Sequence, residues 1–118
     1  KNGGQIVNIS SMSGHRVPPS GGFYAATKFA VRAITEALRY ELKSKGNKTR
    51  VAMISPGFVD TPLLENYFRG DEETLTALRQ DIEMLKPQDI ARTLIHILET
   101  PNHVEIGDVM MRPSDQKI

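Results

Sequence analysis

Cysteine and tryptophan are absent from this chain of 118 residues. Without cysteine there is no disulfide bridge, no thiolate zinc site and no cysteine nucleophile. The chain also has no large excess of positive or negative charge, because 15 basic and 14 acidic side chains leave a formal net charge of +1. Such a balance supplies no field to attract a polyanion, so we expect no nucleic-acid partner.

Long apolar runs are missing as well, since none approaches the roughly 20 residues of a membrane-spanning helix. The chain starts at Lys1 with neither an initiating methionine nor the pattern of a secretory signal peptide. We therefore expect a piece of a longer, cytoplasmic protein without a membrane span. Its hydrophobic content of 39% and charged content of 25% are ordinary for a folded domain.

Strand and helix patterns alternate along the chain. Apolar runs predict strands over residues 5–10, 50–55 and 107–111, the first two of them buried. Apolar periodicity and helix-end signals predict helices over residues 23–45, 62–68, 71–85 and from Pro87 to just before Pro101. This order predicts an α/β fold with a parallel sheet, and residues 1–118 match the C-terminal half of a single doubly wound, Rossmann-type domain. None of the nine glycines forms the G-x-G-x-x-G turn that holds a pyrophosphate, so that dinucleotide-binding part is absent.

The helix over residues 23–45 is apolar around much of its circumference. We expect one side to cover the sheet and the other to meet a further helix or a partner chain. Gly46 is placed to end this helix. Thr61 and Pro62 are typical of an N-cap and first helical residue.

A tyrosine and a lysine one helical turn apart carry the strongest chemical signal. Tyr24 and Lys28 are spaced i,i+4 at the start of a predicted helix, so their side chains share a face. A phenol has a reference pKa near 10, and a neighbouring ammonium group favours its ionised form. Ser11 follows a predicted strand, at the end where ligands bind in open α/β sheets. Its hydroxyl could hold a carbonyl or alcohol oxygen beside Tyr24, although Tyr-x-x-x-Lys alone also fits a surface aromatic over a lysine stem.

These residues resemble the short-chain dehydrogenase/reductase family. Ser11 precedes Tyr24 by thirteen residues, the customary separation in that family, whereas Ser10 and Ser13 are displaced from that position. The resemblance implies that Tyr24 is the general acid/base and that Ser11 orients the substrate oxygen. It also implies that Lys28 supports the phenolate and, with Tyr24, contacts the nicotinamide ribose. The family's catalytic asparagine has no counterpart here, since neither Asn2 nor Asn8 matches its position.

A second segment, Ser55 to Thr61, resembles the family's Pro-Gly motif. The resemblance implies that Pro56, Gly57, Val59 and Thr61 bind the cofactor, with the backbone near Val59 and the Thr61 side chain holding the nicotinamide carboxamide. The alternative is a turn followed by a threonine N-cap, and both can hold at once. Four apolar residues follow: Leu63, Leu64, Tyr67 and Phe68. The family has a mobile lid over the substrate at this place, which would make Leu63 and Tyr67 substrate-binding residues together with Ser11 and Tyr24. The alternative is that the four residues only bury one face of a helix.

The segments at residues 11–17 and 106–116 resemble one subgroup, that of the animal dehydrogenase/reductase family member eleven and the insect farnesol dehydrogenases. The resemblance implies an NADP-dependent alcohol dehydrogenase or carbonyl reductase, with NAD(H) not excluded. It also implies apolar, terpenoid or steroid-like substrates and a homodimer or homotetramer. The alternative is a truncated, non-catalytic module that binds a partner. No metal site is expected, because His15, His96 and His103 are scattered; His15 is interpreted as an exposed loop residue and His96 as structural.

Overall fold

The computed structural model describes residues 3–117. The prediction for Asn2 therefore lies outside the described residues. The elements, in chain order, are β1 (Gln5–Ile9), the short 3-10 helix η1 (Met12–Gly14), α1 (Gly22–Ser44), β2 (Arg50–Pro56), α2 (Pro62–Tyr67), α3 (Glu72–Asp81), α4 (Pro87–Glu99) and β3 (Asp108–Met111).

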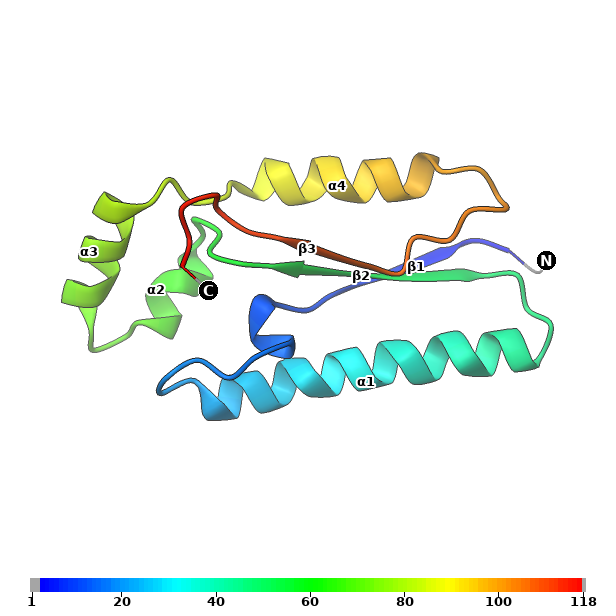
Figure 1. The fold of residues 1–118 in the computed structure, drawn as a ribbon, viewed down its shortest axis with the longest axis horizontal. Helices are drawn as coiled ribbons and strands as arrows, with labels where there is room; N and C mark the ends of the chain where they lie inside the picture. The colour runs from blue at the N-terminus through cyan, green and yellow to red at the C-terminus, as the bar shows by residue number, and fades with distance from the viewer. Residues whose placement is uncertain (1–2, 118) are drawn as a thin grey trace.

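The three strands form one parallel sheet in the order β1-β2-β3. Gln5 lies opposite Arg50, and Met53 lies opposite Asp108. Helix α1 covers one face of the sheet and α4 covers the other (Figure 1). The predicted α/β fold with a parallel sheet is confirmed. Each connection between two parallel strands needs a crossover, and the helices supply it.

Strand β2 is the centre of the core. Its residues from Val51 to Pro56 are all buried, as the prediction of a strand covered on both faces requires. Ala52 and Ile54 pack against Ile97 of α4, and partly buried apolar side chains from β1, α4, β3 and the residues just before β3 surround this cluster: Val7, Ile90, Leu94, Ile106, Val109 and Met111. Burial of these side chains stabilises the sheet in proportion to the apolar area removed from water.

Strand β1 departs from the prediction that it is buried. Ile6 is 36% exposed and Ile9 is 47% exposed. Within the described residues, β1 has a strand partner on one side only, so its outer edge is open and its side chains are partly uncovered.

Helix α1 ends as predicted before Gly46, whose φ of +66° lies in the left-handed region that favours glycine. The N–H of Asn47 donates to the carbonyl of Leu42 at 2.9 Å, and the N–H of Gly46 donates to that of Lys43 at 3.0 Å. These two bonds form a Schellman motif, which satisfies carbonyls that the helix leaves free.

One prediction about a helix end is wrong. The helix predicted over residues 71–85 ends at Asp81, because the following residues extend and Leu85 pairs with Val59 in a parallel bridge. Thr61 and Pro62 occupy the N-cap and first helical positions of α2, as predicted, although the Thr61 side chain makes no capping hydrogen bond. Asp71 does cap α3, accepting a hydrogen bond from the N–H of Thr74 at 3.3 Å.

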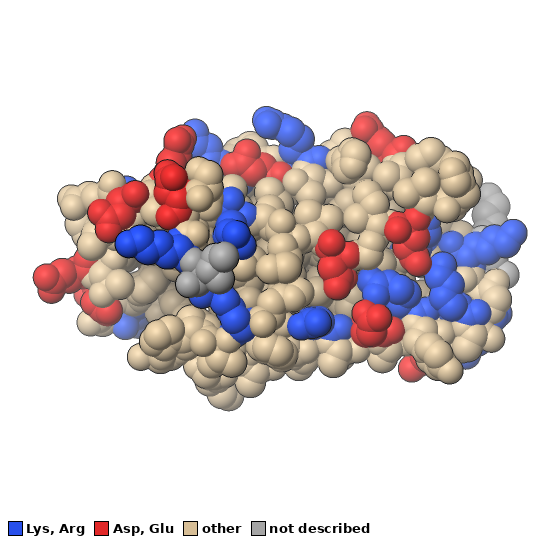
Figure 2. All heavy atoms as spheres, in the orientation of Figure 1, with Lys and Arg blue, Asp and Glu red and all other residues tan. Residues whose placement is uncertain are grey.

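The outer face of α1 is apolar and uncovered by the described residues. Phe23 is 88% exposed, Ile34 62% and Tyr40 76%. Acidic and basic side chains are interspersed on the face drawn in Figure 2, whereas the lower edge, over the first half of α1, carries few of either. No helix within residues 3–117 is long and apolar enough to cross a membrane.

Candidate active site

The carboxyl ends of the strands meet η1, the start of α1, helix α2 and the C-terminal segment at one end of the molecule (Figure 1). Parallel strands align their carboxyl ends, and open α/β sheets bind ligands there. Ser11, Tyr24 and the segment after Pro56 all belong to this end, because each follows a strand or starts the helix after one.

Ser11 connects β1 to η1 and has an extended backbone, with φ −162° and ψ 163°. Its Oγ accepts a hydrogen bond from the N–H of Ser13 at 3.1 Å. A hydroxyl carries one proton and two lone pairs, so this bond uses a lone pair and leaves the proton available. Ser11 can therefore donate a hydrogen bond to a ligand oxygen while its own position is held by the turn.

Tyr24 and Lys28 lie together on α1, as their spacing predicts. The Nζ of Lys28 is 5.7 Å from the centroid of the Tyr24 ring. This distance is within the range of a cation–π contact. Both side chains are half-buried, so the pair combines a charged group with an aromatic hydroxyl at the edge of solvent.

Ser10 ties the serine loop to the helix that carries Lys28. The Ser10 hydroxyl, 4% exposed, donates to the backbone carbonyl of Lys28 at 3.2 Å. A Cβ on Gly14 would lie 2.6 Å from this hydroxyl and 3.0 Å from the same carbonyl, so only glycine fits there. The loop bearing Ser11 and the helix bearing Lys28 are thus in direct contact. The sequence contained no signal for this contact apart from the glycine itself.

Helix α2 places Tyr67 against Tyr24, whereas Leu63 and Leu64 of the same helix lie in different environments. The rings of Tyr67 and Tyr24 meet edge to face with centroids 5.3 Å apart. Leu64 is buried against Leu75 and Met84, whereas Leu63 is 63% exposed. The predicted apolar face of α2 therefore has two parts: Leu64 serves packing, and Tyr67 contacts the candidate acid/base.

The Pro-Gly segment ends β2 and is held by backbone contacts. The N–H of Gly57 donates to the carbonyl of Met111 at 2.7 Å. Beyond it, the Phe58 carbonyl accepts from the N–H of Leu85 at 3.0 Å, and the N–H of Asp60 donates to the Leu85 carbonyl at 2.8 Å. In this parallel bridge the peptide N–H and C=O of Val59 face away from Leu85. Val59 can thus present a donor and an acceptor to a planar amide.

The prediction that His15 is an exposed loop residue is wrong, because its side chain is half-buried. Its Nε2 lies 3.0 Å from the Oγ of Ser55, a residue of β2 that is fully buried. Burial lowers the pKa of His15 below 6.5; the Arg32 guanidinium lowers it further, and the Asp108 carboxylate opposes both. The neutral imidazole is therefore the form that the fold favours.

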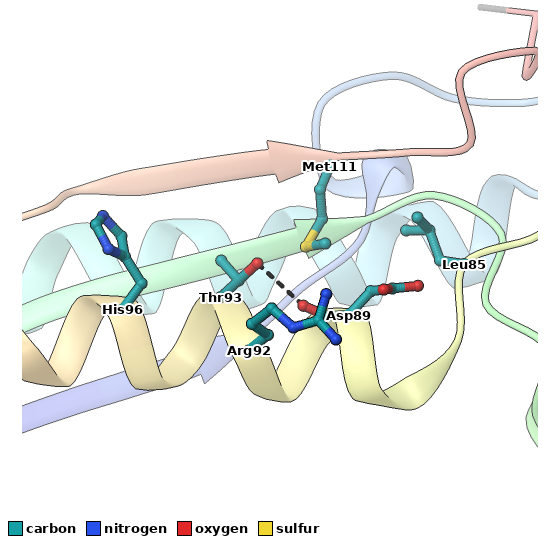
Figure 3. Close-up of a pocket in the computed structure, with 6 residues that line it drawn as sticks. All are labelled: Leu85, Asp89, Arg92, Thr93, His96 and Met111. Carbon is teal, nitrogen blue, oxygen red and sulfur yellow. Dashed lines mark hydrogen bonds between the residues drawn. The ribbon is translucent and has the colours of Figure 1, made fainter.

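A hollow of about 410 Å³ lies elsewhere, between α4 and β3 (Figure 3). It is lined by Leu85, Asp89, Arg92, Thr93, His96 and Met111. None of the predicted catalytic, cofactor-binding or substrate-binding residues is among them. His96, interpreted as a structural residue, is exposed beside this hollow and is not packed in the core.

Residues 1–72 match a family model described as short chain dehydrogenase. Dehydrogenase/reductase SDR family member 11 of Bos taurus is 47% identical over 115 residues, which are 96% of this chain and 45% of that protein. An uncharacterised oxidoreductase of Staphylococcus saprophyticus is 37% identical over 98% of this chain and 46% of its own length. The chain therefore spans about half the length of the curated relatives it matches.

Solved structures resemble the fold over nearly the whole chain. A closed form of serine dehydrogenase complexed with NADP+ has a TM-score of 0.86 at 33% identity, covering 98% of this chain and 46% of that one. An alcohol dehydrogenase from the archaeon Thermococcus sibiricus complexed with 5-hydroxy-NADP has a TM-score of 0.71 at 28% identity, with coverages of 98% and 44%.

Proposed function

This chain belongs to the short-chain dehydrogenase family, as its motifs predicted, and from that premise we propose the activity of the intact protein that contains it. Residues 1–118 are the C-terminal part of one dehydrogenase domain. The intact protein interconverts an alcohol with a ketone or aldehyde and uses NADP(H), with NAD(H) as the alternative. Support for the cofactor comes from the serine dehydrogenase neighbour, which is complexed with NADP+.

The observation that carries this proposal is the ammonium of Lys28 beside the ring of Tyr24, at the end of the sheet where Ser11 lies. Lys28 places its positive charge beside the ring of Tyr24. Tyr24 gives a proton to the carbonyl oxygen during reduction and takes it from the alcohol during oxidation. Ser11 donates a hydrogen bond to that same oxygen and so fixes its position.

The backbone after Pro56 fits a nicotinamide. The peptide N–H and C=O of Val59 face away from Leu85 and match the acceptor and donor of a carboxamide. Pro56, Gly57, Val59 and Thr61 would hold that group, while Tyr24 and Lys28 would contact its ribose. When held there, a nicotinamide would supply the hydride for reduction and accept it in oxidation.

The substrate is an apolar alcohol or carbonyl compound, of terpenoid or steroid-like size. Tyr67, which packs edge to face against Tyr24, is 39% exposed, and Leu63 of the same helix is 63% exposed, so both offer apolar surface to a ligand. Binding a substrate over these residues would remove this apolar area from water, which favours apolar ligands. It would also keep water away from the reacting carbon.

The partner is a second copy of the same protein, in a homodimer or homotetramer. Phe23, Ile34 and Tyr40 form an apolar outer face on α1 that the described residues leave uncovered. Exposed apolar surface of this kind marks an association site. We also expect a cytoplasmic location, which fractionation would test.

The experiment measures NADPH-dependent reduction of apolar ketones and aldehydes by the intact protein. Tyr24→Phe should lower kcat/KM by about 10²- to 10⁴-fold, since it removes the proton donor but keeps the ring. Thr76→Val is the control, because it also removes one hydroxyl, from an exposed residue of α3 that belongs to none of the proposed binding surfaces.

Full activity in the Tyr24→Phe protein would contradict the proposal. If the folded wild type has no reductase activity and forms a stable complex with another protein, the chain is a non-catalytic interaction module instead.

A further inference from the structure

The C-terminal segment after β3 turns back onto the Pro-Gly segment. The N–H of Gln116 donates to the carbonyl of Pro113 at 3.0 Å, which closes a turn. Gln116 is only 8% exposed, whereas Ser114, Asp115 and Lys117 around it are exposed. A buried amide is costly unless it is hydrogen-bonded, so its partner indicates why this polar residue is held inside.

That partner is the backbone of the proposed cofactor segment. The Oε1 of Gln116 accepts a hydrogen bond from the N–H of Phe58 at 3.0 Å. The two residues are 58 positions apart, so the contact exists only because β3 runs beside β2 and ends next to it. Figure 1 shows the C-terminal segment passing close to the end of β2, at the same end as α2.

Gly57 is shaped to this contact. A Cβ on Gly57 would lie 2.3 Å from the Oε1 of Gln116 and 2.8 Å from the Cβ of Arg112. Those distances are below van der Waals contact, so the glutamine oxygen fills the space that a side chain at position 57 would need. The glycine of the motif therefore has a second role here, which is to let the C-terminal segment approach.

The segment from Phe58 to Asp60 is consequently held on two sides. Leu85 bonds to the Phe58 carbonyl and to the Asp60 N–H, while Gln116 bonds to the Phe58 N–H. Val59 lies between these bonds with its own peptide groups facing away from Leu85. Fixing both neighbours of Val59 restricts the backbone dihedral angles that orient those groups.

We propose that Gln116 is a positioning residue for the cofactor segment: its side chain fixes Phe58, and through it the Val59 peptide groups that receive the nicotinamide carboxamide. This inference rests on the proposed function and extends the binding machinery to the last residues of the chain. In this proposal Gln116 acts on the cofactor only through Phe58 and Val59.

The test compares three variants of the intact protein. Gln116→Met keeps the length of the side chain but has no oxygen to accept the bond. Gln116→Glu keeps an acceptor oxygen at the same distance along the side chain. Asp115→Asn changes the exposed neighbouring residue and serves as the control.

Two quantities are measured. Hydrogen exchange of the Phe58 amide should accelerate about fivefold to tenfold in Gln116→Met, the range expected from losing one hydrogen bond. The dissociation constant for NADPH should rise by a similar factor, while KM for the carbonyl substrate stays within about twofold. Gln116→Glu should restore both quantities towards the wild-type values, and Asp115→Asn should change neither.

Unchanged Phe58 exchange and unchanged NADPH affinity in Gln116→Met would overturn the inference. Accelerated exchange of amides throughout β2 and β3, with no recovery in Gln116→Glu, would also overturn it, because the residue would then act on stability alone. If the wild type binds no nicotinamide cofactor, the proposed function fails first, and the exchange of Phe58 still decides whether Gln116 holds the segment.

Discussion

At the scale of single residues, the candidate site depends on groups that lie beside the expected catalytic residues. Ser10 bonds to the carbonyl of Lys28, so the position of Ser11 and the start of α1 are linked. His15 bonds to Ser55, the residue before Pro56. These two contacts join the loop of Ser11 to the start of α1 and to the Pro-Gly segment.

The bond of His15 has a consequence for stability against pH. Burial, and secondly Arg32, lower the pKa of His15 below 6.5 in the folded protein, with Asp108 acting in the opposite direction. The unfolded chain then binds a proton at pH values where the folded chain does not, so stability rises with pH in that window. The contribution is complete above 6.5 and decreases as pH falls from 6.5 towards the lowered pKa.

Urea unfolding of the intact protein at about pH 7.5 and about pH 5.5 measures this effect. The wild type should lose more unfolding free energy between the two conditions than His15→Gln, whose side chain keeps polar atoms near Ser55 but does not titrate. Equal losses in both proteins would show that His15 is as easily protonated in the fold as in the unfolded chain.

At the scale of elements, α2 and α3 form a unit with a core of its own. Leu64, Leu75 and Met84 are buried together, and the partly buried side chains around them come from the same stretch of chain: Phe58, Phe68, Leu78 and Ile82. The sheet has a separate cluster around Ile54. A unit with few contacts to the main core can open locally at lower cost than global unfolding.

Leu75→Ala should therefore loosen the substrate-side helices without loosening the sheet. Truncating a buried leucine costs about 2–5 kcal/mol, so amides in residues 62–81 should exchange on the order of 30-fold faster or more. Amides of β2 should change much less. Thr76→Ala, on the exposed face of the same helix, is the control. An equal loss of protection in β2 would mean that the two clusters unfold as one.

At the scale of the whole molecule, the fold is more elongated and less compact than a complete domain with the same number of residues. Its radius of gyration is 16.0 Å and its extents are 51 × 27 × 22 Å. About 13–14 Å is typical for a compact domain of this length. The elongated shape goes with two surfaces that the described residues leave uncovered, the open edge of β1 and the outer face of α1, and such surfaces need cover.

Association through the outer face of α1 is the prediction that belongs to this scale. Ile34→Glu places a charge on that face and should convert a dimer or tetramer of the intact protein to monomer in light scattering. Leu98→Glu makes the same kind of change at a 44% exposed residue of α4 and should retain at least the dimer. A wild type that is monomeric at micromolar concentration would contradict the proposed partner.

Local spacing explains what could be predicted from the sequence. Tyr24 and Lys28 are one helical turn apart, so any helix through them places the two side chains on one face. The order of apolar runs and helical periods likewise determined the α/β class and the parallel sheet, and Gly46 determined the end of α1. Each of these depends on residues close in the chain, which obey backbone geometry wherever they lie.

Only the tertiary structure decided the contacts between distant segments. His15 meets Ser55 across 40 positions, and Gln116 meets Phe58 across 58. The same packing ended the helix of residues 71–85 early, because Leu85 bonds to the backbone beside Val59. Such contacts depend on which strands pair and in which register, a property of the folded sheet that no local pattern contains.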